Sequence, residues 1–304
     1  MKLLAGNVYL WGKASQNSLL VQCLGPAMRE IQDEGLASGF WFDRFDARGP
    51  HIFFLTRPVS DPAAVCALLA ERLTTFLARL PATEEIPAAE LDERRQRVLG
   101  KALCAADTLP GPAENRTFVL VEHEPDGYPF RLAADLRDAP GFWRLLDELS
   151  FWTVEQIASV PDSAMNATAI RWFASLDGAL RQAGAAREFW RYHAETLLPG
   201  LREKLAEDGE LETGMSASLE AALSDRNRDA FARLWHQVEC SGSTWPQIGR
   251  LVKLALAVNG SSRRFAALRE ATHATWKQLG LPVRQEIPVV LFAWRRHQPP
   301  GGLA

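Results

Sequence analysis

The sequence lacks the short motifs that mark metal-dependent, nucleotide-dependent and hydrolytic enzymes. Its four cysteines, Cys23, Cys66, Cys104 and Cys240, lie far apart and form no CxxC pair, so neither a zinc ribbon nor a thiol redox motif is indicated. The six histidines never recur at the spacing of metal ligands. There is also no Walker loop, no GxGxxG and no GxSxG, which weakens the case for nucleotide-dependent chemistry and for a hydrolase triad.

The chain also lacks a long apolar run and a large excess of charge of either sign. No apolar segment approaches the roughly 20 residues that span a bilayer, and the N-terminal residues do not have the pattern of a signal peptide. The net charge of −3 gives no reason to expect a nucleic-acid or anionic-membrane partner. We therefore expect a cytoplasmic protein that binds neither nucleic acid nor membrane.

What the sequence does contain is an ordinary globular composition with many tryptophans. The 304 residues, of which 47% are hydrophobic and 23% charged, can bury a sizeable core. Ten tryptophans against three tyrosines is an unusual ratio. Large rings either fill a core or line a groove for a bulky ligand, and we expect most of these to belong to the core.

The N-terminal half alternates between strand and helix patterns. A helix over 61–80 begins with Ser60 or Asp61 as its cap and Pro62 in its first turn. The predicted elements, in order, are a strand at 6–12, a helix at 15–36 capped by Ser15 and interrupted at Pro26, strands at 40–45 and 51–56, helices at 61–80 and 88–105, and a strand at 116–124. This order predicts an α+β fold with a ferredoxin-like antiparallel sheet and helices on one face.

The C-terminal half reads as mainly helical. Apolar residues at helical spacing predict helices at 141–158, 167–205 (one helix or two), 216–238, 244–258 and 262–279. The β-branched run from Glu286 to Trp294 favours a returning strand, and the Pro/Gly-rich residues 298–304 favour a disordered tail. We expect one domain over 1–297, with an α+β sheet part at 1–135 and a mainly helical part at 136–297.

The hairpin at 40–57 is the most distinctive segment. Its first strand carries Trp41 and Arg44, and its second begins at His51, directly after the turn residues Gly49 and Pro50. Two interpretations of His51 are open: a strand-end histidine bonded to a nearby backbone carbonyl, or a general acid or base at the sheet edge. Arg44 likewise either pairs with a neighbouring aspartate or binds a substrate amide or carboxylate as a planar fork.

Other candidate residues lie at the end of the last predicted strand and on a basic helix. Glu122, His123 and Glu124 end that strand, and Tyr128 follows the turn; either they are solvated and packed, or one points into a cleft. The patch formed by Arg94, Arg95 and Arg97 is either a solvated helical face or a surface that captures an acidic peptide segment.

The hairpin resembles the lantibiotic dehydratase C-terminal domain, which also occurs alone as thiopeptide-type bacteriocin biosynthesis proteins. The matching residues are Trp41-Phe-Asp-Arg-Phe45 and the Gly49-Pro-His-Ile52 turn. A looser similarity extends through Asp147-Glu-Leu-Ser-Phe-Trp152 and Leu251-Val-Lys-Leu-Ala-Leu-Ala-Val-Asn-Gly260.

The resemblance implies work on ribosomally made peptides that carry a leader segment. Fused members eliminate glutamate from glutamylated Ser or Thr, whereas stand-alone members perform that elimination or a later formal aza-[4+2] cycloaddition of two dehydroalanines. Eliminating members usually run His-Leu-Arg-Leu-Arg after the turn, but Phe53 and Leu55 stand here where arginines are expected, and Lys253 stands where those members carry histidine. Because elimination needs a base and cations, this departure favours the cycloaddition branch, as in thiopeptide pyridine synthases.

Cycloaddition requires proton transfer and close alignment of two dehydroalanines, and no cofactor. It forms the pyridine-type macrocycle core and releases the leader peptide. The candidates for proton transfer are His51, His123, Glu124 and Tyr128. The candidates for substrate binding are Arg44, Lys253, Trp41, Arg94, Arg95 and Arg97.

The expected partner is a leader-bearing modified precursor peptide, with other enzymes of the same pathway as further candidates. Two alternatives remain open. One is a glutamate-eliminating lyase with rearranged catalytic residues, and the other is a non-catalytic scaffold that binds the leader.

Overall fold

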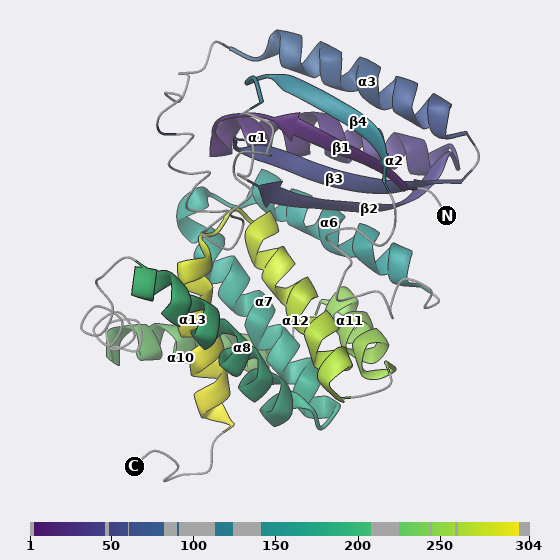
Figure 1. The fold of residues 1–304 in the computed structure, drawn as a ribbon. Helices are drawn as coiled ribbons and strands as arrows, with labels where there is room; N and C mark the ends of the chain where they lie inside the picture. Colours follow the sequence, from purple (N-terminus) through teal and green to yellow (C-terminus); the bar gives the residue numbers. More distant parts are fainter. Residues whose placement is uncertain are drawn as a thin grey trace. The chain divides into compact units, whose positions relative to one another are not determined.

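The computed structural model describes residues 3–45, 49–59, 61–81, 90, 113–123, 141–207, 225–242, 245–258 and 261–297. The chain divides into two compact units, Met1–Val160 and Pro161–Ala304 (Figure 1). The first contains the described strands and the second is helical. No helix within the described ranges is long and apolar enough to cross a bilayer.

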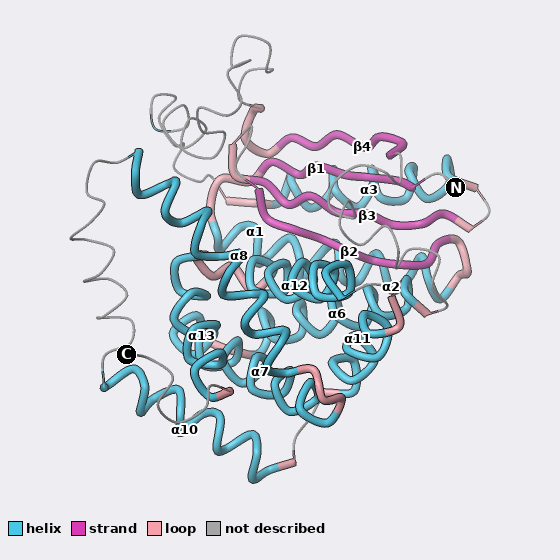
Figure 2. The backbone as a smooth tube through the Cα atoms, turned by 60° about the horizontal axis from the view of Figure 1, so that its bottom comes forward, coloured by secondary structure: helices cyan, strands magenta, loops and turns pink. Residues whose placement is uncertain are grey.

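The first unit contains a four-stranded antiparallel sheet in the order β2-β3-β1-β4, drawn in magenta in Figure 2. The strands are β1 (Leu3–Tyr9), β2 (Ala37–Phe45), β3 (His51–Pro58) and β4 (Thr117–His123). The position of β1 between β3 and β4 is the split βαβ arrangement of the ferredoxin-like fold. The predicted fold class, an α+β N-terminal half and a mainly helical C-terminal half, is therefore confirmed.

One face of the sheet packs against helices from both connections. These are α1 (Lys13–Leu19), the π-helical turn η1 (Leu20–Leu24), α2 (Gly25–Asp33) and α3 (Pro62–Arg79). Their apolar side chains form one core with Val8, Phe42 and Phe54 of the sheet. The cap of α3 is Asp61, whose side chain accepts a hydrogen bond from the Ala63 N–H, as expected from the sequence.

The first helix departs from the prediction at its start and at its interruption. It begins after Gly12, not with Ser15 as its cap, and no side chain caps it. The irregular turn at 20–24 comes before Pro26. Pro26 lies in the first turn of α2, a position that tolerates proline because a backbone N–H is not needed there.

Helix α6 (Phe142–Ser159) is attached to β2 through a bulge between Ser38 and Phe40. The carboxylate of Asp147 accepts the backbone N–H groups of Gly39 and Phe40, at 3.2 and 2.5 Å, and the side-chain amide of Gln32 at 2.6 Å. Burial raises the pKa of Asp147, and these hydrogen bonds only partly offset that effect. The bulge therefore obtains partners for N–H groups that the strand ladder leaves unused.

The helical unit contains α7 (Asp162–Gln182), α8 (Ala186–Glu207), α10 (Asp225–Ser241), α11 (Pro246–Leu256), α12 (Ser261–Gln278) and α13 (Val283–Arg296). Its core includes four fully buried tryptophans, Trp172, Trp190, Trp235 and Trp276, in agreement with the expectation that most tryptophans are core residues. The pattern at 167–205 belongs to two helices, because Gly184, with φ of 69°, ends α7.

The predicted strand at 286–294 is wrong, because these residues lie within α13. Ile287 and the residues from Val289 to Ala293 are all buried, so the run shows no polar side of a helix. A helix buried on nearly every side has the same continuous apolar composition as a buried strand. The helix also contains Pro288, a residue that is uncommon inside helices.

Candidate functional site

The sheet has a second face, opposite the helix-packed core, and this face carries the predicted catalytic histidine. Phe42, Ile52 and Phe54 belong to the core, so their neighbours along each strand point the other way. We call this the second face of the sheet, and its residues are Leu3, Ala5, Asn7, Tyr9, Trp41, Asp43, Phe45, His51, Phe53 and Leu55. Apart from Asn7 and Phe45 these side chains are buried, including Asp43 and His51.

His51 lies among aromatic rings and is held by a backbone carbonyl. Its Nδ1 is 2.8 Å from the Gly49 carbonyl oxygen, and its ring centroid is 4.8 Å from that of Tyr9 and 5.7 Å from that of Phe45. A carbonyl only accepts hydrogen bonds, so Nδ1 carries the proton and Nε2 is the basic nitrogen of the neutral ring. This backbone contact is the one expected of a strand-end histidine, and it also fixes the tautomer that a general base needs.

The strand that follows His51 is apolar on this face. Phe53 and Leu55 are both buried, and they lie across from Asp43 and Trp41 of β2. Arg57, at the end of β3, donates from Nε to the Ser38 hydroxyl at 2.9 Å, and its guanidinium lies over the Trp143 ring. The second face is therefore a buried and mainly apolar surface, which we call the apolar wall, and the polar groups of Asp43 and His51 lie within it.

Arg44 and His51 lie on opposite faces of the hairpin. Arg44 pairs with Ile52, a core-facing residue, and His51 pairs with Phe45. The guanidinium of Arg44 reaches α1, where it donates to Gln16 Oε1 at 3.0 Å and Asn17 Oδ1 at 2.7 Å. The structure thus brings Trp41 and His51 to one face and attaches Arg44 to a helix on the other.

For the remaining predicted site residues, the structure gives the element on which they lie or does not describe them. His123 ends β4, where it pairs with Leu3. Lys253 is exposed on α11 of the helical unit. Glu124, Tyr128, Arg94, Arg95 and Arg97 lie outside the described residues. These assignments, like those of Arg44, His51 and Trp41, remain predictions.

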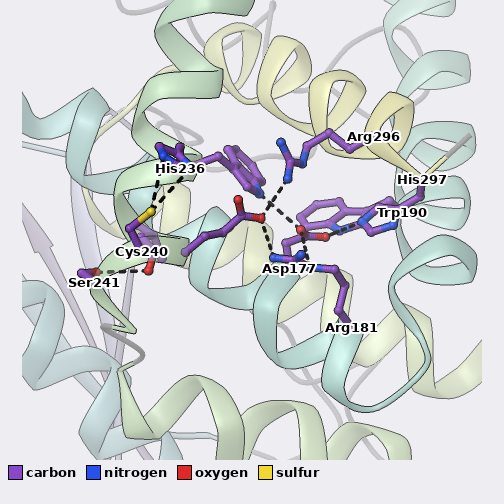
Figure 3. A network of polar contacts seen from close by, with 11 residues as sticks. Asp177, Arg181, Trp190, His236, Cys240, Ser241, Arg296 and His297 are labelled. Atoms are coloured by element: carbon purple, nitrogen blue, oxygen red, sulfur yellow. Dashed lines mark hydrogen bonds and ion pairs between the residues drawn. The ribbon is translucent and has the colours of Figure 1, made fainter.

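Sequence reasoning missed a buried carboxylate, Asp177, in the helical unit (Figure 3). One oxygen accepts from Trp190 Nε1 at 2.8 Å and lies 2.6 Å from His297 Nε2, and the other accepts from Trp235 Nε1 at 3.3 Å. Arg181 adds an ion pair at 3.3 Å. Burial raises the pKa of Asp177, but the interactions with His297, Trp190 and Trp235 outweigh it and leave that pKa lowered.

A second buried carboxylate, Glu286, lies between two histidines. His273 Nδ1 is 2.7 Å from Oε2, and His193 Nε2 is 3.4 Å from Oε1. Burial raises the pKa of Glu286, yet these two histidines outweigh the effect and lower it to about 2. Burial lowers the pKa of His193, whose side chain has no exposed surface. At neutral pH the centre therefore contains an anionic carboxylate and a neutral inner histidine.

One sequence signal was available for each missed carboxylate. Asp177 falls between Phe173 and Leu180, on the apolar side of the predicted helix. Glu286 begins an apolar run. An acid in an apolar pattern indicates a buried, partnered charge. In the described parts of the chain, no group of three or more His, Cys, Asp or Glu side chains is arranged to hold a metal ion.

The sequence matches the family model described as lantibiotic biosynthesis dehydratase C-term over residues 4–297. No curated protein matches it. Among solved structures, the fold is similar to a pyridine synthase, TbtD, from thiomuracin biosynthesis, with a TM-score of 0.67 and 19% identity over 97% of both chains. It is also similar to TsrL, with a TM-score of 0.52 and 13% identity over 97% of this chain and 94% of that one.

A third similar structure is the tRNA-dependent lantibiotic dehydratase MibB from Microbispora sp. 107891. The TM-score is 0.50 and the identity 14%, with 97% of this chain aligned to 28% of the dehydratase. The present chain therefore corresponds to one part of that larger protein. At identities of 13 to 19%, these likenesses establish the fold alone.

Proposed function

The chain belongs to the lantibiotic biosynthesis dehydratase C-terminal family, and from this premise we propose that it is a pyridine synthase in the maturation of a ribosomally made peptide. The substrate would be a leader-bearing precursor with two dehydroalanines. The reaction would be a formal aza-[4+2] cycloaddition that closes a six-membered nitrogen ring and releases the leader. The precursor peptide is the principal partner, and other enzymes of the pathway are further candidates.

The observation that carries this proposal is the apolar wall on the second face of the sheet. Phe53 and Leu55 are buried at the two positions where eliminating members of the family are expected to carry arginine. Elimination of glutamate develops charge on an enolate and on a departing carboxylate, which cations stabilise. Two buried hydrocarbon side chains supply none of that stabilisation. They suit instead the uncharged heterocycles and alkenes of a thiopeptide precursor.

The first chemical step is a proton transfer within one amide. The amide N–H of one dehydroalanine loses its proton and the carbonyl oxygen gains one, which converts the amide to an iminol and gives a 2-azadiene. His51 is suited to this step because its Nδ1 is held by the Gly49 carbonyl, leaving Nε2 as the base. Since one proton leaves nitrogen and one reaches oxygen, the step needs no external acid.

The second step joins the azadiene to the other dehydroalanine. Two new bonds close the ring, and loss of water and of the leader as its carboxamide then makes the ring aromatic. No oxidant is required, because both losses are eliminations. Holding the two alkenes face to face lowers the activation free energy of the ring closure. For well-oriented reacting groups this effect is about 7 kcal/mol or more.

Mass spectrometry of the purified protein with a leader-bearing peptide that contains two dehydroalanines among thiazoles tests the proposal. The expected products are a free leader carboxamide and a pyridine macrocycle. A second incubation uses a glutamylated Ser peptide, and release of free glutamate there, with no macrocycle in the first, would replace cycloaddition by elimination. Leader binding without reaction in either incubation would indicate that the protein is a non-catalytic scaffold that binds the leader.

A further inference from the structure

The helical unit contains a carboxylate–histidine arrangement that the mechanism above does not use. Glu286 of α13 is fully buried, and His273 of α12 lies against its outer oxygen, with Nδ1 2.7 Å from Oε2. His193 of α8 lies against the inner oxygen at 3.4 Å. Three helices therefore converge on one anionic group.

The two buried carboxylates of this unit differ in how fully their hydrogen-bonding capacity is used. Both oxygens of Asp177 have donors among Trp190, Trp235, His297 and Arg181, as expected of a structural centre. Oε1 of Glu286 makes no hydrogen bond. The two ring nitrogens of the wholly buried His193 make none either. The 3.4 Å approach of these two groups has the distance of an ion pair without the alignment of a hydrogen bond. Buried polar atoms left without partners require an explanation, and a functional role is one.

The outer histidine has the geometry of a general base. Because a carboxylate only accepts, the contact with Glu286 places the proton of neutral His273 on Nδ1 and leaves Nε2 basic. The His273 side chain is 29% exposed, whereas His193 has no exposed surface. Nε2 of His273 makes no hydrogen bond to any residue in the described ranges. A carboxylate that orients an accessible imidazole in this way is the arrangement found in catalytic acid–base dyads.

We propose that His273 is a catalytic acid–base group of the peptide-modifying reaction and that Glu286 is its positioning residue. This proposal rests on the proposed function and concerns residues of the helical unit alone. In the base role, Nε2 removes a proton from a substrate amide N–H or ring carbon. In the acid role, the imidazolium returns that proton to the carbonyl oxygen or to the departing hydroxyl, so the histidine ends unchanged.

The charges around this pair favour the cycle. Glu286 stabilises the imidazolium that forms on His273 when it takes a proton. His193, from α8, stays neutral because burial lowers its pKa, so it does not compete for the negative charge. Arg269 and His273, both on α12, also act on His193, and each of them further lowers the pKa of His193.

The test compares His273→Gln and Glu286→Gln with a matched control, His297→Gln, which makes the same chemical change at the Asp177 centre. We expect His273→Gln to lower kcat on the two-dehydroalanine peptide about 10²- to 10⁴-fold without raising the Kd of the leader. It should also remove the acid limb of the pH profile of kcat/KM. Glu286→Gln should keep that limb and lower kcat by less than His273→Gln does, and His297→Gln should change neither.

A second readout does not require turnover. Diethyl pyrocarbonate acylates neutral accessible imidazole, and peptide mapping reports each histidine separately. Bound dehydroalanine peptide should protect His273 and leave the labelling of His297 unaltered. If turnover in His273→Gln equals that of the wild type, or if saturating peptide gives no protection, the acid–base role of His273 is wrong, while the proposed cycloaddition is unaffected. If the wild-type protein binds the peptide but yields no macrocycle, it is the proposed function that fails.

Discussion

Gly39 of β2 lies directly against Trp143 of α6. A Cβ atom at Gly39 would be 2.4 Å from Trp143 Cε3, which is shorter than any tolerable carbon–carbon contact. Gly39 also has a positive φ of 78° at the bulge whose N–H groups bind Asp147. The tight approach explains why β2 has a glycine at this position, and it packs the hairpin against α6.

Replacing Gly39 by alanine should therefore destabilise the first unit. The substitution combines a left-handed backbone cost of about 1–2 kcal/mol with overpacking of about 1–3 kcal/mol. We expect a total loss of about 2–5 kcal/mol in the free energy of unfolding, measured by urea denaturation followed by circular dichroism.

Gly35→Ala is the matched control for this variant. Gly35 has a similar φ of 68° but nothing within 4 Å of its added Cβ, so it isolates the backbone cost. The difference between the two variants then reports the contact with Trp143, and Trp143→Leu should restore part of the loss in Gly39→Ala. Equal losses for the two glycines would contradict the packing argument.

Asp177→Asn should be among the most damaging conservative substitutions in the helical unit. The change removes the negative charge that Arg181 and His297 face and turns an acceptor into a donor near two indole N–H groups. Breaking a buried ion pair on one side costs about 3–5 kcal/mol. Thermal unfolding followed by tryptophan fluorescence would measure it, since Trp190 and Trp235 contact this carboxylate directly.

Glu239→Gln provides the comparison for Asp177→Asn. Glu239 binds Arg181 and Arg296 at 2.6 and 2.8 Å but its side chain is 27% exposed. Partly exposed pairs contribute about 0–1 kcal/mol. A loss from Glu239→Gln as large as that from Asp177→Asn would show that burial does not set the cost.

The stability of the helical unit should fall in acid because of Glu286. Its pKa is lowered from 4.5 to about 2 on folding. The unfolded chain therefore takes up a proton at higher pH than the folded chain. The contribution of this group is fully present above about pH 4.5 and is lost as the pH falls toward 2, by at most about 3 kcal/mol.

Urea unfolding at a series of pH values between 7 and 2.5 would measure this dependence. Glu286→Gln should be less stable than the wild type at pH 7, and the difference should shrink as the pH falls. A difference that stays constant over that range would mean that the carboxylate does not carry the effect.

Local signals in the sequence were sufficient for the sheet and for several helices. The hairpin is encoded by aromatic and β-branched strands around a Gly-Pro turn, and α3 by Asp61 and Pro62 at its start. Each of these signals lies within the element that it specifies, so one sequence reveals it. The break at Gly184, which ends α7, was left open, because the sequence pattern at 167–205 fitted one helix or two.

The buried acid centres could not be predicted because their partners are distant in the sequence. Asp177 and His297 are separated by 120 residues and meet only after α7 and α13 pack. The partners of Arg44 were equally hidden. Strand alternation places Arg44 opposite His51, but it does not reveal that Gln16 and Asn17 accept its hydrogen bonds. The strand predicted at 286–294 failed for a different reason, which is that complete burial erases periodicity.

Substitutions at His51 and Tyr128 test the acid–base assignment in the first unit. His51→Ala removes the imidazole whose Nδ1 contacts the Gly49 carbonyl, and Tyr128→Phe removes one hydroxyl from a residue outside the described ranges. If these groups transfer protons, both variants should bind the leader with unchanged Kd and turn over the two-dehydroalanine peptide about 10²-fold or more slowly. Because His51 is also packed between Tyr9 and Phe45, His51→Gln should accompany His51→Ala to separate lost packing from lost chemistry. A purely structural role for His51 would lower the melting temperature of His51→Ala and leave the kcat of His51→Gln near that of the wild type. Unchanged rates in His51→Gln and Tyr128→Phe would remove both residues from the mechanism and leave the His273–Glu286 pair as the acid–base group to account for.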